Sequence, residues 1–185
     1  MKMDIVAGSG KDEFYTPAYA VKVLLPYLEK GKKVWCPFDT EDSLFVKILR
    51  DYGMDVVHTH IEYGQDFFEL GVPEGTDYII SNPPYSMKTE VLERLFALGI
   101  PFAMLLGVVG IFESQRRFNL FKHNEFEIMY MNKRVSYMED YTSNTTAKNP
   151  PFSSAYVCSK LLPAQTVFEV IDKTDISYGT GEVTE

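Results

Sequence analysis

The chain has 185 residues, of which 45% are hydrophobic and 14% aromatic, and this composition predicts one domain with a substantial apolar core. It argues against intrinsic disorder, because the 13 Phe and 12 Tyr residues supply large apolar areas for a core. The net charge of −8 argues against a protein that binds nucleic acid through bulk positive charge.

Other features of the sequence predict a cytoplasmic protein that does not contact membranes. The longest apolar stretch, residues 100–112, is too short to cross a bilayer and is interrupted by one proline and two glycines. Residues 1–13 lack the charged and apolar blocks of a secretory signal. Cys36 and Cys158 are too few for a disulfide framework or a zinc site, so we expect small buried side chains and no metal.

Strand and helix patterns alternate along the first half of the chain. Thr16 and Pro17 suit the cap and first turn of a helix that continues to about Gly31. The patterns that follow predict a strand over 33–36, a helix from Leu44 that ends before Gly53, a strand over 55–61 and a strand over 77–80.

The second half continues the alternation and ends in an acidic segment. It predicts a helix over 91–98, a strand over 102–106, a helix over 115–123, a strand over 126–131, a loop over 138–151 and a last strand over 152–158. Such alternation predicts an α/β fold, with a mostly parallel sheet covered by helices on both faces. We therefore expect one domain over 1–162 and an acidic tail over 163–185, where five acids accompany one base.

One segment combines unusual residues at the end of a predicted strand, namely Asn82-Pro83-Pro84-Tyr85 after the strand over 77–80. In open parallel sheets, ligands bind beyond the carboxyl ends of the strands. The two prolines make this turn rigid. The Asn82 side-chain oxygen and the Pro83 carbonyl can accept hydrogen bonds from an amine, and Tyr85 offers a face on which a base can stack.

These residues have a chemical use. The exocyclic amine of adenine shares its lone pair with the ring, so it attacks a methyl sulfonium poorly until acceptors localise that lone pair. A base in a duplex must also be flipped out of the stack before it can be modified. The acceptors and the ring of this motif suit a site that activates such an amine.

Asn82-Pro83-Pro84-Tyr85 after an apolar strand resembles the catalytic motif of the amino methyltransferases that use S-adenosylmethionine, most closely the N6-adenine group. The resemblance implies a Rossmann-like class I methyltransferase fold, a mixed sheet whose last strand is antiparallel, and catalysis by these four residues. It implies S-adenosylmethionine as cofactor and nucleic acid as substrate, DNA before RNA.

The resemblance also implies a cofactor site made of several short segments. The segment 14–17 is similar to the family's N-terminal Phe-x-Thr-Pro element, which contacts the methionine end of the cofactor. Asp66 and Phe67 stand where the family places an acid and an aromatic beside the cofactor's adenine. The implied cofactor-binding residues are Phe14, Tyr15, Thr16, Pro17, Cys36, Pro37, Phe38, Asp39, His60, Asp66 and Phe67, with Glu62 as an alternative to His60 for the ribose.

The loop after the first strand departs from the family. Pro37 and Phe38 match, but Cys36 stands at the position of an acid, and the glycines that normally follow are absent from residues 36–43. Two accounts remain open. Either Asp39 or Asp42 binds the methionine ammonium group from a rearranged loop, or the cofactor site is weakened or lost.

The substrate is the least constrained part of this interpretation. Tyr85, Ser86 and Arg134 are expected to contact it, because residues 134–137 resemble a late family motif near the target base. From Ser114 to Lys148 six bases outnumber four acids, so a local basic face is possible. RNA adenine and protein glutamine are alternative acceptors, and a non-catalytic binding or regulatory protein is an alternative of another class. A homodimer that builds a substrate groove is a further hypothesis.

Overall fold

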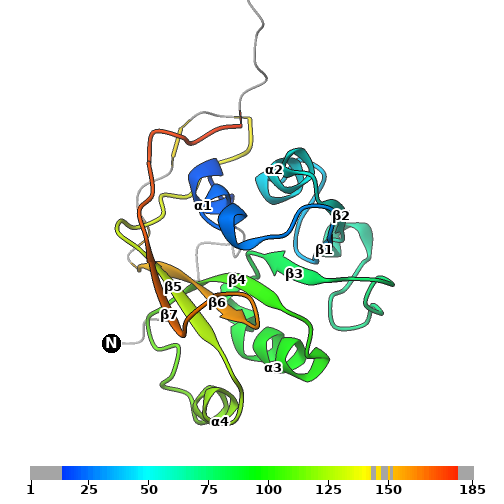
Figure 1. The fold of residues 1–185 in the computed structure, drawn as a ribbon, viewed down its shortest axis with the longest axis vertical. Coiled ribbons are helices and arrows are strands. Elements are labelled where there is room, and N and C mark those ends of the chain that lie inside the picture. The colour runs from blue at the N-terminus through cyan, green and yellow to red at the C-terminus, as the bar shows by residue number, and fades with distance from the viewer. Residues whose placement is uncertain (1–13, 143–144, 147–149, 151, 179–185) are drawn as a thin grey trace, which may run out of the picture.

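Seven strands form one sheet at the centre of the protein, which we describe from a computed structural model over residues 14–142, 145–146, 150 and 152–178 (Figure 1). The strands lie in the order β2-β1-β3-β4-β6-β5-β7. Their bounds are β1 Lys33–Cys36, β2 Asp55–His58, β3 Tyr78–Ser81, β4 Phe102–Gly107, β5 Glu127–Met131, β6 Ser154–Ser159 and β7 Thr166–Glu169.

Strand direction decides which loops share an edge of this sheet. β1 pairs in parallel with β2 and β3, and β3 with β4. β6 is antiparallel to β4 and β5, whereas β7 is parallel to β5. The carboxyl ends of all strands except β6 therefore meet at one edge. The predicted α/β fold is confirmed, with a mostly parallel sheet and the antiparallel strand β6.

Helices cover both faces of the sheet, as Figure 1 shows. The helices α1 (Ala18–Lys22) and α2 (Leu44–Tyr52) lie on one face, and α3 (Lys88–Leu98) and α4 (Gln115–His123) lie on the other. Short 3-10 turns occur at Leu25–Tyr27, Ile61–Tyr63 and Tyr85–Met87. None of the helices in the described parts of the chain is long and apolar enough to cross a membrane.

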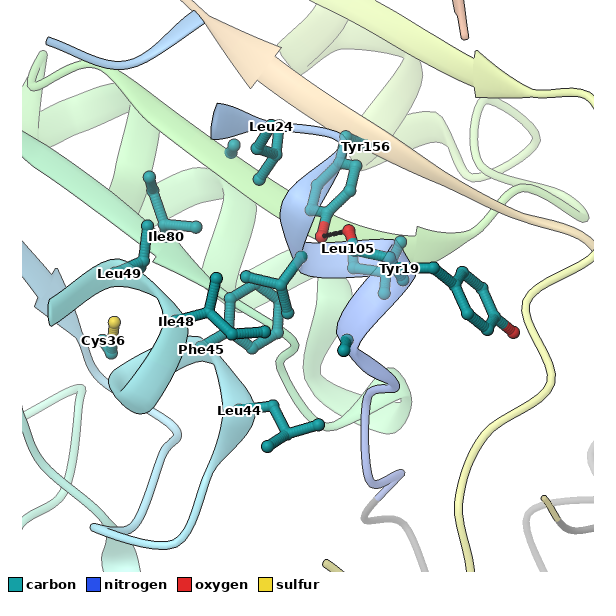
Figure 2. Packing of buried hydrophobic residues seen from close by; sticks show 14 of the residues in the cluster. Tyr19, Leu24, Cys36, Leu44, Phe45, Ile48, Leu49, Ile80, Leu105 and Tyr156 are labelled. Atoms are coloured by element: carbon teal, nitrogen blue, oxygen red, sulfur yellow. Dashed lines mark hydrogen bonds between the residues drawn. The ribbon is translucent and has the colours of Figure 1, made fainter. Parts of the chain in front are cut away.

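The side chains of the strands alternate between two apolar cores. Val34 and Cys36 of β1 face the core under α1 and α2, whereas Trp35 belongs to the core under α3. Figure 2 shows the first core, where the rings and branched side chains of α2 meet those of β3, β4 and β6. In this core the Tyr156 hydroxyl donates a hydrogen bond of 2.5 Å to the Ala20 carbonyl, which fixes α1 against the sheet.

Helix α1 is much shorter than the sequence pattern predicts, because it ends at Lys22 instead of Gly31. The cause is Pro26, whose ring clashes with the carbonyl four residues earlier and removes a backbone donor. The chain continues as a 3-10 turn over Leu25–Tyr27 instead. The expected Thr16 cap is also wrong, since Pro17 is the N-cap residue and makes no side-chain capping bond.

The other boundaries differ by only a few residues, except at the C-terminal end. β2 stops at His58 rather than Ile61, α3 starts at Lys88 rather than Val91, and β6 begins at Ser154 rather than Phe152. β7 was not predicted, and it lies inside the segment expected to be an acidic tail.

The described residues after β7 return to helix α1. The Ala18 and Tyr19 amides donate to the carbonyls of Ile176 and Asp175 at 2.8 and 2.9 Å. Lys22 Nζ also lies 2.7 Å from the Asp175 carboxylate. We call residues 170–178 the C-terminal strap. The strap satisfies amide groups at the start of α1, which a helix cannot satisfy by itself.

Candidate active site

A cavity of about 560 Å³ lies at the carboxyl edge of the sheet, beside the ends of β1 and β3. From β1 the chain passes through α2 to β2 on one side, and from β3 it passes through α3 to β4 on the other. This reversal makes the gap between β1 and β3 the switch point, where open α/β sheets bind ligands. Of the predicted site residues, Phe14, Tyr15, Thr16, Pro37, Phe38, Asp39, His60, Asp66, Phe67, Asn82 and Pro84 line the cavity.

Asn82 follows β3 directly, and its carboxamide is held in one orientation. The Nδ2 group donates to the Phe14 carbonyl and to Thr16 Oγ1, both at 3.1 Å. The Oδ1 atom is buried and has no hydrogen-bond partner among the described residues. A buried acceptor without a partner is uncommon in folded proteins. It marks Asn82 Oδ1 as the atom of this motif that is free to accept a hydrogen bond from a ligand.

Asp39 is a buried carboxylate in the loop between β1 and α2. Its two oxygens accept hydrogen bonds of 2.5 Å from the hydroxyls of Ser43 and Ser81. Burial raises the pKa of Asp39 to about 6, although the serine hydroxyls and the nearby His60 and His58 act in the opposite direction. Ser43 also caps α2 by accepting from the Phe45 amide, so the same residue anchors the helix and the carboxylate.

Both acidic and aromatic side chains line the cavity. The carboxylates of the described lining are Asp39, Asp42, Glu62, Asp66 and Asp140. The described lining also contains one lysine, Lys47, and one histidine, His60. Lys47 Nζ lies 3.4 Å from Asp42, so that charge is partly compensated. Such a lining favours a ligand that carries positive charge.

An aromatic wall stands beside Asp66. The Phe67 ring packs against Phe38 and Trp35, with centroid distances of 4.9 and 5.5 Å. The Arg94 guanidinium lies 4.5 Å from the centroid of Phe67 on the α3 side and supports this ring. The Asp66 carboxylate accepts from the Phe68 amide at 2.9 Å, which orders the turn that carries both groups.

Tyr85 does not line the cavity. Its ring packs against Phe14 and Phe152 at 5.0 and 5.2 Å between centroids. Its hydroxyl lies 2.5 Å from the Tyr137 hydroxyl, and Tyr137 in turn lies 2.8 Å from Ser154 Oγ. Burial raises the pKa of Tyr85 to about 12. The ring expected to stack on a base is thus half-buried and packed in an aromatic cluster.

The remaining predicted residues also lie outside the cavity lining. Cys36 is fully buried in the core under α2, Pro17 and Pro83 are buried, and Ser86 and Arg134 are exposed. The basic stretch does not form an open basic face on α4, because Arg116 pairs with Glu90 and Glu93 and Arg117 donates to the carbonyls of Gly110 and Ile111.

Sequence patterns missed several lining residues. Asp140, Tyr141 and Thr142 come from the segment predicted only as a loop, and Tyr141 donates to Ser43 Oγ at 3.4 Å. The Tyr141 ring packs edge-on against Tyr15 at 4.8 Å between centroids. No local pattern predicts a contact between residues so distant in the chain. The other missed residues are Thr40, Lys47, Ile61, Gln65, Phe68 and Met87.

No protein-family model matches the chain, and no curated protein sequence matches it. Its structure is similar to that of a modification subunit of a putative type I restriction enzyme from Vibrio vulnificus YJ016, with a TM-score of 0.53 and 12% sequence identity. The match covers 95% of this chain and 47% of that chain, so this chain spans about half of that subunit. At this identity the likeness shows the fold alone, and it agrees with the predicted α/β fold with a mostly parallel sheet.

Proposed function

We propose that this protein is an S-adenosylmethionine-dependent methyltransferase that acts on an exocyclic amine, with N6 of adenine in DNA as the preferred acceptor. The observation that carries the proposal is the uncommitted Asn82 Oδ1, buried at the switch point beside an acidic and aromatic cavity. The structural similarity to a restriction-enzyme modification subunit supports DNA as the substrate class.

The residues of the cavity fit S-adenosylmethionine, which carries an ammonium group, a sulfonium group and an adenine ring. Asp39 and Asp42 suit the ammonium group, and His60 or Glu62 suits the ribose hydroxyls. Phe38, Phe67 and Asp66 suit the adenine, since two rings and an acceptor meet there. Glycine is absent from the loop over 36–43, so in this proposal the side chains named above bind the cofactor without a glycine-rich loop.

In the proposed reaction, the bound cofactor supplies an electrophilic methyl group. Asn82 Oδ1 and the Pro83 carbonyl accept hydrogen bonds from the amine of the acceptor and localise its lone pair on nitrogen. S-adenosylmethionine held by these residues would give up its methyl group and leave as the demethylated thioether, and the methylated amine would lose one proton to water. Pro84 keeps the turn rigid, so the two carbonyl oxygens are in position before the substrate amine binds.

The first test is ligand binding followed by transfer. Thermal unfolding with S-adenosylmethionine at about one hundred times its dissociation constant should show a stabilisation of about 2.7 kcal/mol. Transfer of a tritiated methyl group is then measured with adenine-containing DNA, the same sequence as RNA, and a glutamine peptide. Labelling of DNA supports the proposal in full, whereas labelling of RNA or peptide alone changes the acceptor. No stabilisation at millimolar ligand contradicts the proposal.

One observation favours a second candidate, a binding or regulatory protein without transfer. The Tyr85 ring lies against Phe14 and its hydroxyl against Tyr137, so no stacking face opens on the cavity. This candidate predicts cofactor-induced stabilisation without labelling of any acceptor.

The proposal includes self-association of two copies to build a groove for the substrate. Sedimentation at several protein concentrations tests it, and a single monomeric species at every concentration contradicts it.

A further inference from the structure

The segment before α1 holds the carboxamide of Asn82 by both of its N–H groups. One group donates to the Phe14 carbonyl and the other to Thr16 Oγ1, each over 3.1 Å. An asparagine side chain has two N–H donors and one carbonyl acceptor. Both donors are therefore used within the protein, and Oδ1 is the one atom left for a ligand.

Thr16 is free to serve this purpose because α1 does not use it. Pro17 is the N-cap residue of the helix, and no side chain caps it. Thr16 is 1% exposed and lines the cavity next to Asn82. A hydroxyl that is buried beside a cavity, and is not used for capping, can be dedicated to a neighbouring side chain.

The Phe14 carbonyl determines which end of the carboxamide faces the segment. A carbonyl can only accept, so rotation of the carboxamide by half a turn would place Asn82 Oδ1 against another acceptor. The rotated side chain would also present its N–H group to the ligand. Thr16 Oγ1 accepts from the second N–H group on the same side, and this second bond holds the carboxamide in the observed orientation.

We propose that Thr16 is a positioning residue that, together with the Phe14 carbonyl, holds Asn82 as an obligate acceptor, so that the site takes an amino group and rejects a carbonyl of the same shape. This inference rests on the proposed function. It differs from the role that the family resemblance implies for Thr16, which is direct contact with the methionine end of the cofactor.

Kinetics separate the two roles of Thr16. Thr16→Val should lower kcat about tenfold while the dissociation constant of S-adenosylmethionine stays within about twofold, and Thr16→Ser should recover most of the loss. In an Asn82→Ala background, Thr16→Val should cause no further loss, because the group that it positions is gone. The matched control is Thr89→Val, since Thr89 is a buried threonine on α3 that accepts from Arg117.

Discrimination between bases tests the stated specificity. A duplex with hypoxanthine at the target position carries a carbonyl where adenine has its amine. It should compete with the adenine duplex better in Thr16→Val than in the wild type or Thr16→Ser. The proposal is overturned if Thr16→Val weakens cofactor binding as much as it lowers kcat/KM, or if its effect persists in the Asn82→Ala background.

Side-chain amide NMR gives a readout that does not need activity. The Asn82 side-chain signals are identified by their loss in Asn82→Ala. Their hydrogen exchange should be slow in the wild type and Thr16→Ser, and faster in Thr16→Val. If this pattern appears but the wild type transfers no methyl group, the proposed function fails and the positioning role stands. Equal exchange in the wild type and Thr16→Val overturns the positioning role whatever the activity.

Discussion

Asn82 is the residue on which the proposed chemistry depends most directly, through its side-chain carboxamide. Its Oδ1 atom has no partner in the described part of the chain, and the two acceptors of its Nδ2 group, the Phe14 carbonyl and Thr16 Oγ1, belong to residues that line the cavity, where water can replace the lost donor. Asn82→Ala should therefore fold normally and bind cofactor within about threefold of wild type, but lose at least about one hundredfold in kcat. Calorimetry and methyl-transfer rates measure the two effects.

The control for this variant is Asn119→Ala, because Asn119 is an exposed residue of α4 that contacts only Gln115 among the bonds described. Retained turnover in Asn82→Ala would assign the acceptor role to another group. A fall in cofactor binding parallel to the fall in kcat would place Asn82 in the cofactor site.

Asp39 makes stability depend on pH. Burial raises its pKa from 3.8 to about 6, so between these values the folded protein binds a proton that the unfolded chain has released. The free energy of unfolding therefore falls as pH rises through this range, by about 3 kcal/mol in total. The stabilisation is complete below the lower value and is lost above the higher one.

Asp39→Asn removes this dependence. The variant should be more stable than wild type at about pH 7.5 and similar to it at about pH 4, where the wild-type carboxyl is neutral. Urea unfolding of both proteins across this range measures the difference. A difference that does not change with pH would show that Asp39 titrates normally in the folded protein.

Sequence and structure agree best where a single residue decides the local outcome. Asn82-Pro83-Pro84-Tyr85 ends β3 as expected, and Ser43 begins α2 where the apolar pattern starts. The predicted length of helix α1 is wrong because Pro26 prevents the helix from continuing, although the apolar pattern of this segment suits a helix.

The rest of the site depends on contacts between distant segments. Asn82 is oriented by a hydrogen bond to the Phe14 carbonyl, and Tyr141 of the cavity lining is held by a hydrogen bond to Ser43. Neither contact has a local signal in the sequence, because the two residues of each pair lie far apart in the chain. Tyr85 illustrates the same limit, since its enclosure depends on Tyr137 and Phe152. β7 escaped prediction because it is a four-residue edge strand with alternate exposed positions.

The C-terminal strap links the end of the described chain to the candidate site. Its carbonyls accept from the first two residues of α1, directly after the segment that holds Asn82. Ending the chain after Glu169 should therefore lower both the melting temperature and cofactor affinity. Asp175→Asn is the matched control, because it removes the ion pair with Lys22 and keeps the main-chain bonds.

This control should change the free energy of unfolding by less than about 1 kcal/mol, since exposed ion pairs contribute little. Thermal unfolding and cofactor titration compare the three proteins. A truncated chain that binds cofactor as the full chain does would show that α1 holds its position without the strap.

The charge of the whole molecule predicts how it meets a nucleic acid. The net charge is −8, and the two arginines of α4 are engaged within the protein, so the exposed cations of the predicted basic stretch that remain among the described residues are Lys122, Lys133 and Arg134. The logarithm of the DNA association constant should fall with the logarithm of salt concentration with a slope no steeper than about −2. Fluorescence anisotropy with an adenine-containing duplex measures this slope.

A steep slope, of about −5 or beyond, would mean that many phosphates are contacted by cations the described surface does not present. The same titration with Arg134→Ala should reduce the slope by about 1 if Arg134 contacts a phosphate. An unchanged slope in this variant would remove Arg134 from the substrate surface.

The bonds between α1 and the C-terminal strap also set the order in which the protein can mature on the ribosome. The carbonyls of Asp175 and Ile176 accept hydrogen bonds from the amides of Tyr19 and Ala18. Asp175 and Ile176 are synthesised long after these two residues of α1. The two main-chain bonds that tie the start of α1 to the strap, directly after the segment that orients Asn82, therefore form only when translation of the described chain is nearly finished. A nascent chain that already contains β1 to β4 thus lacks the completed site, and a prematurely terminated product is not expected to compete with the full protein for cofactor.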